Sequence, residues 1–431
     1  MIYEDLLENL MGIELIDSHE HFQAESAYVC GAYDFFDLLE PYVVDSLISS
    51  GMTMPEWRSL RDKRQSLEDR WRFLAPWIAN IRFTTTFRAL EISMQALYER
   101  SIESVDDTIE ISRRMAVEGK GLFDRILKPL HILKVCTFVG VFGVAELRDG
   151  FLEPIPTVSD FIPRNRQGLD QIESATGVRP RGMESLGRAI DTLFEYYRVN
   201  RIRALKFGNG YRRHLDFSQP DSAEAGKVLD RIINGKERGD DLMLGKPGQT
   251  LSFDEALPLD DWISERFFSL AEDAGLPVIF HVAMHAWNAN NPDYAHAHHL
   301  TDMLFRHPRL RVEILHAGAP FIDEAILLAR YFPCVTLNLT WAHVIDREIT
   351  RNAIRSCVEA LPLHKVTAFG GDCCYPQQVP GHLRIALENL AKGLQPMVED
   401  RSLSFETAID IARQWLYENP RNFYGQVDSI L

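Results

Sequence analysis

The chain has 431 residues, 46% of them hydrophobic and 25% charged, which is enough apolar material for a large globular core. Acidic residues outnumber basic ones by 62 to 46, and the formal net charge of −16 argues against nucleic acid or an anionic membrane as the main partner. No apolar run reaches the roughly 18 residues that a membrane span needs. The N-terminal stretch MIYEDLLENLMG lacks secretion-signal features, and the six cysteines form no C-x-x-C pair, so we expect a cytoplasmic protein with reduced thiols.

Eight short apolar segments recur along the chain, each followed by a polar turn and a helical pattern. They are residues 13–19, 132–139, 156–163, 202–207, 277–282, 311–316, 334–339 and 365–370. This alternation is typical of parallel strands joined by helices. Eight such repeats predict the α/β class and a (β/α)8 TIM barrel.

Two intervals are too long for simple strand-to-helix connections. Residues 22–128 carry helical patterns rich in aromatic residues, and we interpret them as a helical insertion after the first strand that covers the barrel mouth. The barrel itself is then assigned to residues 1–21 and 129–431. In the second interval, 211–268, the glycine-rich stretch 234–250 is predicted to be an exposed loop.

The predicted strands end repeatedly in residues that bind metals or transfer protons. In chain order these are His19, His21, Lys206, His281, His316 and Asp372. Chemistry in a (β/α)8 barrel takes place at the C-terminal ends of the strands, and residues i and i+2 of an extended segment face the same way. The sequence therefore predicts a site for a divalent metal at the barrel mouth. Imidazole and carboxylate ligands favour zinc, with manganese, iron or cobalt as alternatives.

Other histidines lack this support from strand position. We expect them to be surface or loop residues, with His285 close enough to the fifth strand to touch a substrate; they are His285, His296, His298, His299, His343 and His364.

Several motifs resemble the amidohydrolase superfamily, in particular its type 2 group. The match is densest at DSHEH (17–21), at LHAGAPFIDEAILLARYFPCVTLNLTW and at FGGDCCYP. The segment ALKFGNGYRR is similar to nodulin-like members. The long insertion and the segment FIPRNR look like uronate isomerases, although FIPRNR departs from their Arg-Pro-Asp pattern.

The resemblance implies a set of roles for the strand-end residues. His19, His21, His281 and Asp372 match the ligands of a first metal. His316 matches either a ligand of a second metal or a catalytic histidine, so one or two ions are expected. Lys206 matches a lysine that is carbamylated and bridges two metals in some members; it would otherwise be a plain lysine that binds substrate, or one exposed at the barrel rim.

The expected chemistry uses a metal-activated water, with Asp372 as general base and then general acid. His316 or the metal would polarise the substrate carbonyl, and Asp17 would support the ligands from behind. Candidate substrate-binding residues are Arg82, Arg88, Arg166 and Trp341. Each arginine has the alternative of lying on a solvated helix face or in an ion pair.

These features predict a metal-dependent hydrolase of a small, carboxylate-bearing amide, ester or lactone. A decarboxylase and an aldose–ketose isomerase of a uronate are alternatives at the same kind of site, and a metal-binding scaffold without catalysis is a third. The sequence does not determine whether the protein forms a homo-oligomer. It also leaves the metal, the substrate and the carbamylation of Lys206 undetermined.

Overall fold

A computed structural model describes residues 2–29, 33–144, 147, 150–217, 221–235, 251–286 and 290–425 of the chain. Its eight parallel strands lie in the sheet in chain order. They are β1 (Leu15–Glu20), β2 (Ile132–Gly140), β3 (Leu152–Thr157), β4 (Leu205–Phe207), β5 (Val278–His281), β6 (Val312–Leu315), β7 (Val335–Asn338) and β8 (Val366–Thr367). The predicted (β/α)8 barrel is confirmed.

Backbone hydrogen bonds join the segment after β8 back to β1. The Ser18 amide donates to the Phe369 carbonyl at 3.2 Å, and the Asp372 amide donates to the His19 carbonyl at 2.8 Å. The two ends of the sheet are therefore held together directly, and the last strand end lies against the first one.

The third strand lies earlier than the sequence pattern predicts. β3 covers Leu152–Thr157, and the predicted segment 156–163 forms its last residues and the 3-10 turn Val158–Phe161. Pro154 and Pro156 stand inside β3, and prolines normally argue against a strand because they cannot donate a ladder hydrogen bond. FIPRNR therefore follows the strand end instead of forming it.

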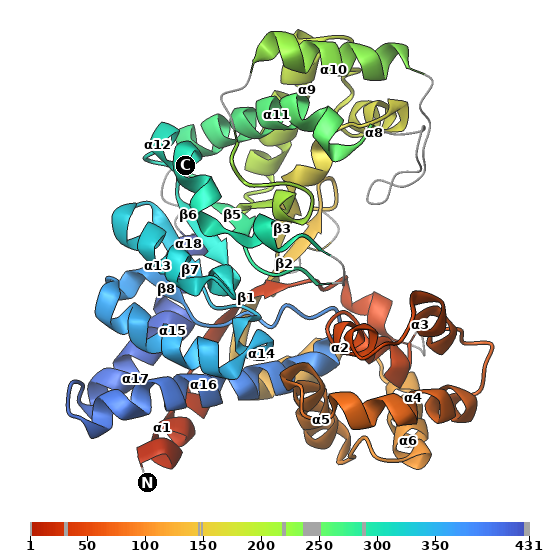
Figure 1. The fold of residues 1–431 in the computed structure, drawn as a ribbon, viewed down its shortest axis with the longest axis vertical. Helices are drawn as coiled ribbons and strands as arrows, with labels where there is room; N and C mark the ends of the chain where they lie inside the picture. The colour runs from red at the N-terminus through yellow and green to blue at the C-terminus, as the bar shows by residue number, and fades with distance from the viewer. Residues whose placement is uncertain are drawn as a thin grey trace.

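Helices surround the barrel (Figure 1). Those outside the insertion are α1 (Ile2–Met11), α8 (Arg166–Thr176), α9 (Met183–Val199), α10 (Ser222–Asn234), α11 (Phe253–Asp273), α12 (Thr301–Arg306), α13 (Ile322–Tyr331), α14 (Ala342–Ile345), α15 (Arg347–Ala360), α16 (Val379–Glu399), α17 (Phe405–Arg413) and α18 (Asn419–Gly425). In the predicted exposed loop 234–250, residues 236–250 lie outside the described part of the chain. No helix in the described ranges is long and apolar enough to cross a membrane.

The described part of the segment between β1 and β2 forms six helices. They are α2 (Val43–Ser49), α3 (Met54–Leu60), α4 (Leu67–Ile81), α5 (Thr85–Tyr98), α6 (Val105–Ala116) and α7 (Leu122–Leu127). Of these, α2–α6 share an apolar core of their own, whereas α7 packs into the barrel core. Capping boxes begin α3 at Thr53 and α6 at Ser104. Figure 1 shows α3–α6 grouped to one side of the barrel, beside α16. The segment just before α2, which carries Tyr42, reaches the strand ends, as described below.

One glycine fixes how closely the insertion approaches the barrel helices. A Cβ on Gly381 of α16 would collide with the Ala89 backbone carbonyl of α5. Ser93 of α5 reinforces the contact, because its hydroxyl accepts a hydrogen bond from the Gly381 amide at 2.8 Å. The two helices therefore pack backbone to backbone at this point.

Candidate metal centre

Two histidines at the end of β1 point at one oxygen of one carboxylate. His19 is the fifth residue of β1, and His21 follows the strand directly. The His19 Nε2 atom lies 2.9 Å from Asp372 Oδ1, and the His21 Nε2 atom lies 3.1 Å from the same oxygen. The ligand atoms of these three residues, the metal trio hereafter, all lie within 4.8 Å of one another. Two imidazoles and a carboxylate are a common donor set for zinc and other first-row divalent metals.

The glycines before Asp372 allow this geometry. Asp372 has φ of 57°, in the left-handed region that few non-glycine residues adopt. A Cβ on Gly370 would collide with the Thr340 hydroxyl, and a Cβ on Gly371 would collide with the Glu20 carboxylate. The sequence FGGD can therefore run close against β1, where the Asp372 side chain meets both histidines.

The protonation states suit metal binding. Burial by itself would raise the pKa of Asp372, but the adjacent His19 and His21 outweigh that effect and hold the pKa well below its usual value. Burial also lowers the pKa of His19 well below 6.5, so its ring is neutral at pH 7. A divalent metal needs a deprotonated carboxylate and neutral imidazoles, and the trio supplies both.

Two buried carboxyls lie directly behind the trio. Asp17 accepts hydrogen bonds from the His19 amide at 3.3 Å and from the Gly371 amide at 3.2 Å. Glu20 accepts one from the Cys373 amide at 2.5 Å. Burial raises the pKa of Asp17 to about 6 and the pKa of Glu20 well above its usual value. Asp17 thus supports the site through the backbone of the ligand segments, and Glu20 fixes the segment after β8.

The strand-end histidines of β5 and β6 hydrogen-bond to each other. His316 Nδ1 donates to the Thr340 carbonyl at 3.0 Å, and its Nε2 lies 3.0 Å from His281 Nδ1. His316 Nδ1 is also 3.9 Å from Asp372 Oδ2, and burial lowers the pKa of His316 to about 4. His281 therefore reaches the trio through His316, and its role as a metal ligand stays a prediction.

An aromatic pair walls the same site. Trp341 is buried, and its indole contacts the His316 ring edge to face at 5.3 Å. The face of Trp341 stacks on Tyr42, whose hydroxyl lies close enough to Asp372 for this carboxylate to raise the pKa of the phenol. Burial and this carboxylate raise the pKa of Tyr42 well above 10, so the phenol stays protonated. Sequence reasoning missed Tyr42, because nothing in the aromatic-rich insertion distinguishes it from a core residue.

Lys206 is buried in the barrel and is not a rim lysine. Its Nζ lies 4.8 Å from the centre of the Phe138 ring, and the His19 ring packs on the same phenylalanine at 3.9 Å. Burial lowers the pKa of Lys206 to about 7, although Asp372 and Glu313 favour the charged form. A substrate carboxylate beside it would favour the ammonium form further.

The family model for amidohydrolases matches residues 245–426, which carry His281, His316 and Asp372. The resemblance to the amidohydrolase superfamily is confirmed. No curated protein matches the sequence with significance.

Three solved structures share the fold over nearly the whole chain. Glucuronate isomerase from Caulobacter crescentus has 16% identity and a TM-score of 0.76, covering 98% of this chain and 94% of that one. Uronate isomerase from Thermotoga maritima has 13% identity and a TM-score of 0.75, covering 98% and 97%. A protein named as a metal-dependent hydrolase from Lactobacillus casei has 14% identity and a TM-score of 0.66, covering 99% and 98%. At these identities the similarity establishes the fold.

The arginines proposed from the sequence as substrate ligands lie elsewhere. Arg82 caps the end of α4 and stacks on the exposed Phe83, and Arg166 is an exposed residue at the start of α8. Arg88 pairs with Glu91 at 3.2 Å. All three arginines are exposed, and within the described ranges none of them contacts the metal trio.

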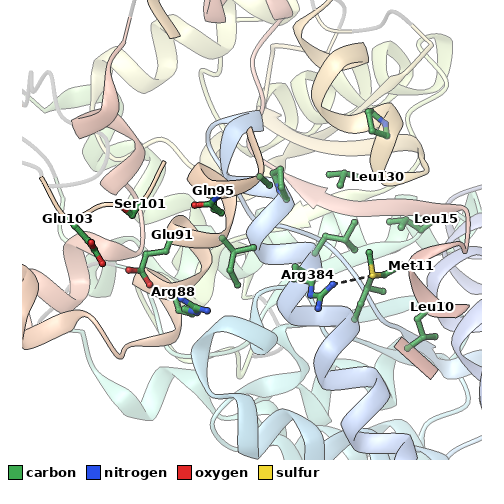
Figure 2. Close-up of a pocket in the computed structure, with 16 residues that line it drawn as sticks. Leu10, Met11, Leu15, Arg88, Glu91, Gln95, Ser101, Glu103, Leu130 and Arg384 are labelled. Atoms are coloured by element: carbon green, nitrogen blue, oxygen red, sulfur yellow. Dashed lines mark hydrogen bonds and ion pairs between the residues drawn. The ribbon is translucent and has the colours of Figure 1, made fainter. Parts of the chain in front are cut away.

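Arg88 and Glu91 line a separate cavity of about 580 Å³ between α1, α5 and α16 (Figure 2). Its walls include Leu10 of α1, Leu15 at the start of β1 and Leu130 just before β2. The cavity therefore lies at the opposite end of the strands from the metal trio.

Proposed function

We propose that this protein is an enzyme that uses a single divalent metal and interconverts an aldose and a ketose form of a small sugar acid of the uronate class. The observation that carries the proposal is the pairing of His281 with His316 at 3.0 Å. The two histidines contact each other and leave His19, His21 and Asp372 as one compact donor set. This arrangement favours one ion over two, and a single ion favours isomerisation over hydrolysis by a bridged pair of metals.

The solved structures also support isomerisation over hydrolysis. Proteins whose names describe uronate or glucuronate isomerases align over 98% of this chain, a span that includes the helical insertion. The insertion supplies Tyr42, so the shared architecture bears directly on the site. The shared fold alone does not fix a substrate.

The residues of this chain suit a proton transfer between two carbons that carry oxygens. A metal held by the trio would supply Lewis-acid stabilisation of the substrate oxygens. Asp372 is ionised and is the candidate base for the carbon-bound proton. The Tyr42 phenol is protonated and lies beside Asp372, so it can turn its one O–H from this carboxylate to a substrate oxygen. Lys206 is buried, and a substrate carboxylate beside it would favour its ammonium form.

Hydrolysis is the second candidate. Lys206 and His316 both occupy the strand ends where the resemblance expects hydrolytic residues, and the Lactobacillus casei protein named as a metal-dependent hydrolase shares the fold. FIPRNR also departs from the uronate-isomerase pattern. In the structure Arg164 of this segment donates to the Leu251 carbonyl at 3.0 Å and stacks on Phe253.

The test is an isomerisation assay in deuterium oxide. Protein loaded with Zn²⁺ or Mn²⁺ is incubated with glucuronate and galacturonate, and NMR follows ketose formation and the entry of solvent deuterium at the reacting carbons. Asp372→Asn should abolish both signals, while His364→Ala, an exposed histidine after α15, should leave them unchanged. Turnover of lactones or N-acyl amino acids without ketose formation would establish hydrolysis instead. Loss of absorbance from conjugated carboxylic acids would establish decarboxylation.

A further inference from the structure

A second group of metal-type side chains lies on the loops that follow β4 and β5. His214 follows the 3-10 turn Asn209–Tyr211, Asp293 lies in the turn Pro292–Ala295, and His299 lies in the turn Ala297–Leu300. The candidate ligand atoms of these three residues all lie within 4.8 Å of one another. They are separate from the metal trio and take no part in the chemistry proposed above.

The three side chains already contact one another closely. His214 Nε2 lies 2.5 Å from Asp293 Oδ2. The His214 and His299 ring centroids are 4.7 Å apart, and His299 Nε2 donates to the Asp293 carbonyl at 3.2 Å. An ion 2.0–2.2 Å from each of three ligands places their atoms about 3.3 Å apart. The present spacing of up to 4.8 Å is therefore within about 1.5 Å of the one that an ion needs.

The backbone that carries the triad is anchored. Arg213, next to His214, is buried and donates to Asp261 at 2.6 Å. On the other loop, Ala297 and Leu300 of the same turn as His299 are fully buried. Burial, together with the adjacent His298 and His214, lowers the pKa of His299, which keeps its ring neutral at pH 7. Ligands held in place lose little entropy when an ion binds.

We propose that His214, Asp293 and His299 bind one divalent transition-metal ion of the zinc type, and that this ion ties the loop after β4 to the loop after β5. An exposed ion pair between His214 and Asp293 would by itself stabilise the fold little. Three convergent ligands from two loops about 80 residues apart in sequence form a chelate instead.

The ion would hold both loops next to the metal trio. Tyr211, three residues before His214, contacts the His281 ring at a tilt with centroids 4.2 Å apart and stacks on the His285 ring at 4.6 Å. Asn291 and Pro292, just before Asp293, line a cavity together with His285 and Met284. Fixing His214 to Asp293 and His299 therefore restrains residues that contact the proposed active site.

A neighbouring triad provides the matched control. Its two histidines, His296 and His298, contact separate oxygens of Glu324 at 2.8 and 3.1 Å. These histidines lie at a single turn, so an ion held there would not join the loop after β4 to the loop after β5. His298 and His299 are adjacent in sequence, so His298→Ala and His299→Ala remove the same group from neighbouring positions.

The test is equilibrium dialysis of the full chain against Zn²⁺, followed by elemental analysis. The wild-type protein should retain one equivalent more than His299→Ala, and His298→Ala should match the wild type. His21→Ala should lose a different equivalent, so the double variant His21→Ala/His299→Ala loses both. The proposal is overturned if His299→Ala retains as much Zn²⁺ as the wild type, or if His298→Ala loses an equivalent in its place.

Hydrogen exchange tests the connection between the two loops. With Zn²⁺ at ten times its dissociation constant, local opening of residues 209–217 should slow about elevenfold in the wild-type protein. In His299→Ala the same addition should leave the exchange rate of this segment unchanged. Unchanged exchange in the wild type with Zn²⁺ bound would overturn the role of the ion as a link.

Discussion

The indole of Trp341 stacks on the phenol of Tyr42, with ring centroids 4.5 Å apart and ring planes 23° apart. Trp341 follows β7, and Tyr42 comes from the segment before α2, about 300 residues earlier in the chain. The stack places the Tyr42 hydroxyl on Asp372. Through this pair the insertion contributes directly to the metal centre.

Tyr42→Phe should impair catalysis while leaving the fold intact. The variant keeps the stack on Trp341 and removes the hydroxyl that contacts Asp372. Loss of one positioned donor at a reacting centre typically lowers kcat by about 10²-fold. The measurement is kcat together with the melting temperature. An unchanged kcat would remove Tyr42 from the proposed chemistry, whereas a large fall in melting temperature would indicate a structural role.

His21→Ala should remove bound metal. His21 is the more exposed ligand, with 45% of its side chain accessible, so its loss should leave the barrel folded. Removing one of three ligands weakens metal affinity strongly, because the remaining two cannot complete the donor set. Elemental analysis of protein purified without added metal measures the effect, with His364→Ala as the control for loss of an exposed histidine. Metal content equal to that of the wild type would contradict the assignment of the trio.

Gly381→Ala should destabilise the protein. The added methyl collides with the Ala89 carbonyl across the contact between α16 and α5, and overpacking of this kind costs about 1–3 kcal/mol. Gly187→Ala in α9 is the matched control, since its Cβ would make an ordinary contact 3.7 Å from Trp262. A helical Gly→Ala change without a clash stabilises by up to about 1 kcal/mol. Urea unfolding measures the free energy of unfolding of both variants. Equal values would contradict the prediction, because they would show that α16 and α5 move apart at little cost.

Lys206→Met should raise stability, most strongly at and below pH 7. Burial lowers the pKa of Lys206 from 10.5 in the unfolded chain to about 7 in the folded one. Between about pH 7 and pH 10.5, Lys206 is protonated in the unfolded chain and neutral in the folded one. The free energy of unfolding of the wild type therefore rises with pH in this range, by up to about 1.4 kcal/mol per pH unit. Below pH 7 the full cost of burying the charge is present.

The measurement for Lys206 is urea unfolding of metal-free protein between pH 6.5 and 9.5. Lys206→Met should show a flatter pH dependence than the wild type, while Lys120→Met, at an exposed position, should follow the wild-type curve. Parallel curves for Lys206→Met and the wild type would mean that the lysine is solvated in the folded state.

The sequence by itself determined the barrel and most of the residues at its mouth. Period-two and continuous apolar segments mark buried parallel strands, and a barrel gathers the ends of all its strands in one place. His19, His21, His316 and Asp372 could therefore be placed together from strand order alone. The sequence pattern places the third strand later than β3 lies, because the two prolines inside β3 hide the strand signal.

Only the tertiary structure decided which of these side chains meet. His281 hydrogen-bonds to His316, a contact that depends on side-chain torsions, and strand position does not encode these torsions. The long-range approach of Tyr42 to Asp372 depends on how the insertion packs on α16, and the sequence gives no register for that contact. The exposure of Arg82, Arg88 and Arg166 was hidden from the sequence for the same reason, since a helix face can be assigned to solvent or to a site only when its packing partner is known. His343, expected at the surface, is buried by the packing of α14 against α16.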